Sequence, residues 1–127
     1  MNQKYSRNEH LKLKRKIDRL FEGGTWLGKY PLRMVYYADF ELENTQIGVS
    51  VSKRNFKRAV DRNSVKRLLR ECYRLHKEEL SKAFPSPVCL MLIYTGRKIL
   101  TFKELEEKYL ILLKEQANRN THSQIEI

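Results

Sequence analysis

Cysteine and histidine are scarce in this chain, which has two of the first and three of the second. Cys72 and Cys89 each lie within an apolar pattern, where a free thiol behaves as a small buried hydrophobe, so we expect both in the core without a disulfide. The histidines, His10, His76 and His122, are far apart, and none has the spacing of a zinc site. We therefore expect no metal site in the protein.

A long apolar run is also missing. No run reaches the ~18 to 20 residues that a membrane-spanning helix requires, and the basic N-terminal segment does not have the form of a signal peptide. With 127 residues, 41% hydrophobic and 32% charged, the composition fits one globular domain with a modest core. We expect a cytoplasmic protein, a single domain over residues 1–127, with a core at about 6–114 and flexible ends at 1–5 and 115–127.

Motifs for protein-borne catalysis are missing as well. The sequence has no Walker loop, no His-Glu-x-x-His motif and no nucleophile elbow. A nuclease that uses two metals needs several carboxylates around ions ~4 Å apart, and Asp18, Asp39 and Asp61 are isolated along the chain. We therefore predict a binding protein with no catalytic residues of its own.

Acidic residues are outnumbered by basic ones, 15 against 26, and the excess is concentrated in one segment. Residues 53–77 contain ten basic and two acidic residues, and so carry eight of the eleven net positive charges. Val65, Leu69 and Cys72 have the spacing of a buried helix face, and the basic residues recur beside it. Since acidic partners at i,i+4 are nearly absent, we infer that phosphates neutralise this face. A solvated helix face is the alternative.

The sequence AVDRNSVKRLLRE at 59–71, preceded by GVSVSKR at 48–54, resembles the Arg-Asn-Arg region of the bacterial ribonuclease P protein subunit. The family has a basic residue within the stretch where this chain has Ser64-Val65-Lys66-Arg67, so the match rests on Arg62, Asn63, Lys66, Arg67 and Arg70. A looser similarity covers residues 6–114. The resemblance implies an α/β fold (α+β sandwich) with an about four-stranded mixed sheet and helices packed on it. The implied order is α-β-β-β-α-β-α, ribosomal protein S5 domain 2-like with a left-handed crossover.

Hydrophobic periodicity locates most of these elements. It predicts helices at about 14–22, 61–83 and 101–114, and strands at about 31–40, 46–52 and 88–95. Ser6 and Glu9 have the form of a capping box, and Asp61 and Thr101 are the expected N-caps of the second and third helices. The almost wholly apolar strand 88–95 is expected to be buried on both faces. Beyond Lys114 we expect fraying.

Two RNA-binding surfaces are expected. The first, on the basic segment, docks on the catalytic RNA mainly through phosphates and comprises Lys53, Arg54, Lys57, Arg58, Arg62, Asn63, Lys66, Arg67 and Arg70. The second, which the resemblance implies, is a cleft between the first helix and the sheet that holds the single-stranded leader of precursor tRNA. Its expected residues are Ile17, Phe21, Tyr36, Tyr37, Ser50 and Ser52.

The second surface is expected to bind a nucleic-acid strand through close contact with its backbone and stacking on its bases. Gly48, Ser50 and Ser52 alternate with apolar residues, and such small or hydroxyl side chains let a nucleic-acid backbone come near the sheet. Aromatic rings beside them stack on bases. The sequence leaves open which alternate set of strand 31–40 lines the cleft, and a sheet face simply covered by a helix is the alternative.

The resemblance also implies the partners. These are the RNase P catalytic RNA and the 5′ leader of precursor tRNA, with no membrane and no DNA. The RNA subunit performs the cleavage that frees the mature tRNA 5′ end, the holoenzyme requires Mg²⁺, and the protein binds no cofactor tightly. The alternatives are a ribosomal-type protein or RNA chaperone without a processing role, a DNA-binding helix, and a self-sufficient protein nuclease. Cleavage of precursor tRNA with and without the cognate RNA separates them.

Overall fold

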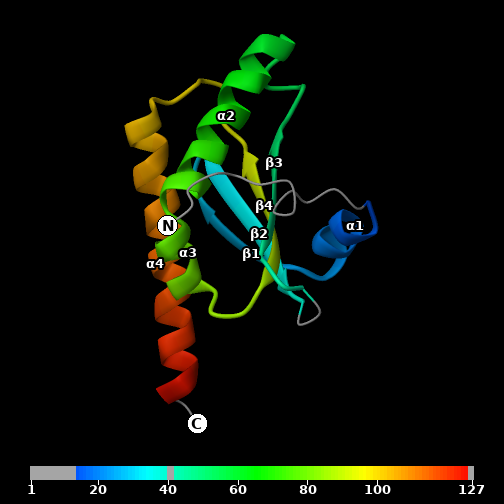
Figure 1. The fold of residues 1–127 in the computed structure, drawn as a ribbon. Coiled ribbons are helices and arrows are strands. Elements are labelled where there is room, and N and C mark those ends of the chain that lie inside the picture. The colour runs from blue at the N-terminus through cyan, green and yellow to red at the C-terminus, as the bar shows by residue number, and fades with distance from the viewer. Residues whose placement is uncertain (1–13, 40–41, 126–127) are drawn as a thin grey trace.

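The structure, a computed structural model, describes residues 14–39 and 42–125. Its elements are α1 (Lys14–Gly23), β1 (Thr25–Lys29), β2 (Leu32–Ala38), β3 (Gln46–Val51), α2 (Ala59–Leu75), α3 (Lys77–Ala83), β4 (Val88–Tyr94) and α4 (Phe102–Ile125). The four strands form one sheet in the order β1-β2-β4-β3. The helices α2, α3 and α4 cover one face of this sheet, and α1 lies on the other (Figure 1).

The sheet is mixed. β2 pairs antiparallel with β1 and with β4, whereas β3 pairs parallel with β4. Since parallel neighbours need a crossover, the chain leaves β3, passes through α2 and α3, and returns as β4. The α/β class and the four-stranded mixed sheet are thus confirmed. The left-handed sense of the crossover stays a prediction.

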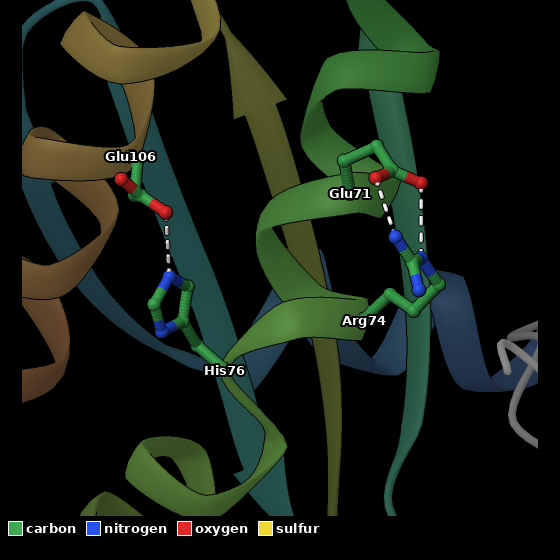
Figure 2. Close-up of polar contacts among 4 residues, drawn as sticks. All are labelled: Glu71, Arg74, His76 and Glu106. Atoms are coloured by element: carbon green, nitrogen blue, oxygen red, sulfur yellow. Dashed lines mark hydrogen bonds and ion pairs between the residues drawn. The ribbon is translucent and has the colours of Figure 1, made fainter. Parts of the chain in front are cut away.

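Two elements differ from those that periodicity located. β1 has only five residues, of which Leu27 alone is buried, so it carries no alternating signal. The long helix predicted at 61–83 is two helices that meet at His76, where φ is −124° and ψ is 39°. The Nε2 atom of His76 lies 2.8 Å from the Glu106 carboxylate on α4, as Figure 2 shows. This contact attaches the junction between α2 and α3 to α4.

One predicted N-cap is confirmed and one is wrong. The Thr101 hydroxyl accepts a hydrogen bond from the Glu104 amide (3.2 Å), and the Glu104 carboxylate accepts one from the Thr101 amide (3.3 Å), which is a capping box. α2 instead begins at Ala59 with Arg58 at its N-cap, and Asp61 lies in its first turn, 3.2 Å from the Arg58 guanidinium. There the carboxylate stabilises the positive end of the helix dipole. Ser6 and Glu9 lie outside the described residues.

The sheet separates two cores of unequal size. The larger one, beneath α2, α3 and α4, includes Leu69, Leu92 and Tyr109, and the smaller one, beneath α1, comprises the buried residues Leu20, Val35, Cys89 and Met91. β4 contributes alternately to both, so its predicted burial on two faces is confirmed. Cys72 belongs to the larger core and Cys89 to the smaller, and both are buried free thiols as predicted.

The last helix continues beyond its predicted end. α4 runs to Ile125, and Gln116 is only 5% exposed. Its Oε1 atom accepts a hydrogen bond of 3.0 Å from the Tyr36 hydroxyl. The helix therefore continues past Lys114, where its end was expected, because a buried polar residue such as Gln116 leaves no trace in an apolar pattern. The flexible end at 115–127 stays a prediction. Within 14–39 and 42–125, no helix combines the length and the apolarity that a bilayer crossing demands.

Candidate nucleic-acid interface

The connection between β3 and α2 carries four exposed cations on a backbone held by hydrogen bonds. Lys53, Arg54, Lys57 and Arg58 are all exposed. Arg62, one turn into α2, donates from Nη1 to the carbonyls of Phe56 (2.8 Å) and Lys57 (3.0 Å). Arg62 is thus half-buried, and one of its guanidinium nitrogens is already used in hydrogen bonds within the protein. Arg62 therefore positions the backbone of its basic neighbours, and its contact with RNA stays a prediction.

The same connection is attached to the rest of the sheet. Asn55 donates from Nδ2 to the carbonyl of Thr95, which follows β4, at 3.1 Å. The Arg54 amide donates to the Ser52 hydroxyl at 3.1 Å, and Phe56 is buried in the larger core. An ordered backbone reduces the entropy that phosphate binding costs.

The outward face of α2 is cationic and hollowed. Val65, Leu69, Cys72 and Tyr73 are the buried residues of this helix. A hollow of about 450 Å³ is lined by Asn63, Arg67, Arg70, Glu71 and Arg74. The predicted Asn63, Arg67 and Arg70 thus share one surface, and Lys66 lies half-buried beside it.

One cation of this hollow is already neutralised. Arg74 donates to Glu71 from Nε (3.0 Å) and from Nη2 (2.8 Å), a forked pair visible in Figure 2. These hydrogen bonds lower the pKa of the Glu71 carboxyl below its ordinary value. Among the described residues Arg67 and Arg70 have no such carboxylate within ion-pair distance. They are the side chains that remain available to phosphates.

The face of the sheet beneath α1 is the second predicted surface. Leu20 anchors α1 in the smaller core, and Ile17 and Tyr37 are partly buried against that core. Phe21 is 47% exposed and lies beside Trp26, which packs against the same core. The Arg19 guanidinium lies 4.8 Å from the centre of the Tyr37 ring. Ile17, Phe21 and Tyr37 therefore lie on the same side of the sheet, and their contact with a leader stays a prediction.

Tyr36 does not belong to this surface. Its ring packs edge-on against Phe84 at 4.6 Å between centroids, and its hydroxyl donates to Gln116, both on the face of the sheet covered by α3 and α4. Successive strand residues point to opposite faces, so Tyr37 points toward α1. Placing Tyr36 in the cleft is therefore wrong, and the choice that the sequence left open is settled by the helices that cover the other face.

Ser50 and Ser52 link the two surfaces. Ser50 in β3 pairs with Ile93 of β4, which packs against the core beneath α1. Ser52 follows the last residue of the strand and is exposed, with its hydroxyl bonded to the Arg54 amide. The α1 face of the sheet thus leads directly into the basic connection.

A stacked pair on this face was missed from the sequence. The Arg33 guanidinium lies 4.4 Å from the centre of the Trp26 ring, and the Trp26 ring lies 5.8 Å from that of Phe21 at an angle of 51°. Trp26 lies in the short strand β1, which periodicity did not locate. The only tryptophan of the chain, within TWLGK, was the available signal.

The turn between α1 and β1 brings the helix close to the sheet. A Cβ atom on Gly24 would lie 2.4 Å from the Leu20 carbonyl oxygen and 2.7 Å from Cγ2 of Val35. Glycine is therefore needed where α1 approaches the sheet.

In the part of the chain that the structure describes, no three His, Cys, Asp or Glu residues are grouped to hold a metal ion.

Known proteins are similar to this chain in sequence or in fold. The Ribonuclease P protein component of Porphyromonas gingivalis strain W83 is 44% identical over 78 residues, 60% of this chain and 57% of that protein. That of Coxiella burnetii is 41% identical over 54 residues, 42% of this chain and 43% of that protein. The matched segments thus cover about half of the length of these relatives.

The solved structures agree. The RNase P protein from Staphylococcus aureus has a TM-score of 0.72 at 22% identity, over 84% of this chain and 93% of that one. The RNase P protein from Thermotoga maritima has a TM-score of 0.71 at 24% identity, over 84% and 96%. These similarities show a shared fold. The family model named Ribonuclease P matches residues 5–119, and the chain therefore belongs to the Ribonuclease P protein family.

Proposed function

We propose that this chain is the protein subunit of a ribonuclease P ribonucleoprotein that removes the 5′ leader from precursor tRNA in the cytoplasm. The observation that carries the proposal is the continuity of two surfaces, an ordered basic connection followed by α2, and an aromatic sheet face beneath α1, which meet at Ser52. One surface suits a folded RNA and the other a single strand.

The basic surface would dock on the catalytic RNA. The basic side chains of this surface are all exposed and offer charge and forked donors to phosphates: Lys53, Arg54, Lys57, Arg58, Arg67 and Arg70. Arg58 has a carboxylate neighbour in Asp61, but its side chain is 74% exposed, so the pair is weak. With roughly six to eight phosphate contacts, log K for the RNA falls against log salt with a slope of about −4 to −7.

The α1 face would hold the leader. Phe21 and Trp26 present aromatic rings on which bases stack, and Arg33 adds a cation above the Trp26 ring. Mature tRNA no longer carries the leader, so these contacts favour the precursor over the product. Ile17 on α1 packs against the same small core as Trp26.

Catalysis would be performed by the RNA subunit with Mg²⁺. Mg²⁺ prefers oxygen ligands and retains water, and RNA phosphates supply such oxygens. The protein would bind no cofactor tightly. Its contribution is to neutralise phosphates near the leader and to position the precursor.

Cleavage of a 5′-labelled precursor tRNA tests the proposal. At low Mg²⁺, the cognate RNA subunit with this chain should release the leader faster than the RNA alone, and the chain alone should release none. An RNA-binding protein of the ribosomal type would bind RNA without raising the rate. Cleavage by the chain after ribonuclease digestion of the RNA would contradict the proposed division of labour.

A further inference from the structure

A second cavity, of about 670 Å³, opens at the end of the sheet where β2 begins and β4 ends. Its lining includes Tyr30, Pro31, Gly96, Arg97, Lys98 and Lys108. Leu32 of β2 pairs with Tyr94 of β4, which brings the β1–β2 turn beside the connection that leads to α4. The basic connection to α2 leaves β3 at the same end, because Val51 also pairs with Tyr94.

The floor of this cavity is tightly built. The amide and the hydroxyl of Thr95 both donate to the carbonyl of Pro31, at 2.8 and 3.1 Å. A Cβ atom on Gly96 would lie 2.8 Å from Cβ of Pro31 and 3.1 Å from the Tyr94 ring. Glycine at 96 therefore permits the close approach of the two connections.

The buried Tyr94 orders the basic side of the cavity. Its hydroxyl donates to the carbonyl of Lys98 and accepts a hydrogen bond from the Leu100 amide at 3.3 Å. The backbone that carries Arg97 and Lys98 is thus held from below, while both side chains are exposed. Such a loop presents its cations without a large ordering cost.

The charges around the cavity do not cancel. Arg97, Lys98 and Lys108 line it together with one carboxylate, Glu104. That carboxylate accepts hydrogen bonds from the amide and the hydroxyl of Thr101 as part of the α4 capping box. Among the described residues none of the three cations forms an ion pair. The cavity therefore favours an anion.

We propose that this cavity binds one nucleotide of an RNA strand, with its base against Tyr30 and its phosphate at Arg97 and Lys98. Tyr30 lines the cavity and is 73% exposed as a residue, so its ring is accessible for stacking. The volume lies in the range of small-ligand sites. Asn55 of the basic connection is bonded to Thr95 on the cavity floor, so an RNA strand on that connection passes close to the cavity.

Titration of the isolated chain with uridine 5′-monophosphate tests the site. Backbone NMR signals of Gly96, Lys98 and Leu100 should shift, and the affinity should fall about tenfold in Tyr30→Ala and in the double variant Arg97→Ala/Lys98→Ala. Uridine and inorganic phosphate should each bind about tenfold more weakly than the nucleotide. Lys103→Ala, which removes an exposed cation outside the cavity, should leave the affinity unchanged. Absence of these shifts, or equal affinity in Tyr30→Ala, would overturn the proposal.

A second measurement identifies the RNA, and this step rests on the proposed function. If the nucleotide belongs to the catalytic RNA, Arg97→Ala/Lys98→Ala weakens binding of the chain to that RNA. If it belongs to the substrate, the variant weakens binding of precursor tRNA to the assembled holoenzyme only. Unchanged affinity in both would overturn the site. Failure of the wild-type chain to stimulate cleavage, with the nucleotide titration intact, would count against the proposed function alone.

Discussion

The hydroxyl of Tyr36 on β2 donates a 3.0 Å hydrogen bond to Oε1 of Gln116 on α4. This bond joins the middle of the sheet to the second half of a helix whose apolar stripe has already ended. Strand alternation already places the Tyr36 ring on this face, away from α1, and leaves Tyr37 on the α1 face. We expect loss of the hydrogen bond to affect stability rather than RNA binding.

Gln116→Ala should therefore lower the free energy of unfolding. The substitution leaves the Tyr36 hydroxyl without this partner in a partly buried place, a loss of about 1–3 kcal/mol. Urea unfolding followed by circular dichroism measures the change. Asn118→Ala, at an exposed position on the same helix, is the matched control and should change little. Equal stability of the two variants would show that α4 is not docked at Gln116.

Arg67→Ala and Arg70→Ala should each weaken binding of the catalytic RNA. Both guanidinium groups face the hollow on α2 without an ion pair among the described residues, and each lost phosphate contact reduces the salt slope by about 1. Filter binding at several salt concentrations gives the slope. Lys114→Ala removes an exposed charge from α4 and should leave the slope unchanged. A slope near zero in the wild type would contradict electrostatic docking.

Glu71→Gln should strengthen RNA binding. The Glu71 carboxylate holds the Arg74 guanidinium through two hydrogen bonds at the edge of the same hollow, so its removal frees one cation for phosphate. We expect a steeper salt slope, by about 1, and a higher affinity at low salt. Weaker binding in Glu71→Gln would instead mean that the forked pair positions Arg74 for its contact.

Phe21→Ala and Trp26→Ala should weaken precursor tRNA binding to the holoenzyme while leaving mature tRNA binding nearly unchanged. Each ring is a stacking platform worth ~1–3 kcal/mol per base. Equilibrium binding of both RNAs to each variant gives the comparison. Tyr36→Phe keeps the ring on the opposite face and should not affect either affinity. Equal losses for precursor and mature tRNA would assign Phe21 and Trp26 to packing alone.

Alkaline pH should destabilise the fold in part through Cys72. Burial, with the nearby carboxylates of Glu106 and Glu71, raises the pKa of this thiol from 9.0 to about 12. In the unfolded chain the thiol ionises near its ordinary pKa, so its contribution to stability is complete below pH 9 and is lost as the pH rises toward 12.

The loss from this one group is at most about 1.4 kcal/mol per pH unit. The slope of unfolding free energy against pH between 9 and 11 is the measurement. Cys72→Ala, although less stable at neutral pH, should show a shallower slope because it has no thiol to ionise. Parallel slopes in the two proteins would assign the whole alkaline effect to other groups, such as the buried Tyr109, whose pKa burial also raises.

The sequence predicted those parts of the fold that repeat. Val65, Leu69 and Cys72 marked the buried side of α2, and the continuous apolar run marked β4, because burial of many neighbours imposes a period. His76 and Gln116 are single polar residues whose positions depend on α4 and β2, so their roles appear only when those elements meet. Tertiary packing, which no local pattern encodes, decided these two places.

The candidate site divides in the same way. Charge density alone located the basic connection and α2, since like charges without partners are visible in the sequence. The α1 face needed the sheet: Tyr36 and Tyr37 are indistinguishable until one face is covered, and Trp26 and Arg33 lie on different strands that are joined only by the β1–β2 pairing. The sequence therefore indicated which kinds of side chain the α1 face carries, but not which individual residues lie on it.

The strand order also has a consequence for synthesis of the protein. β4 comes last of the four strands along the chain but lies between β2 and β3 in the sheet. The β1–β2 hairpin and β3 therefore share no pairing until β4 is inserted. Sheets built from contacts so distant along the chain form late. A nascent polypeptide whose residues up to Tyr94 have not all left the ribosome has the basic helix α2 but not the complete sheet on which α2 packs. The protein should therefore reach its full affinity for RNA only near the end of translation.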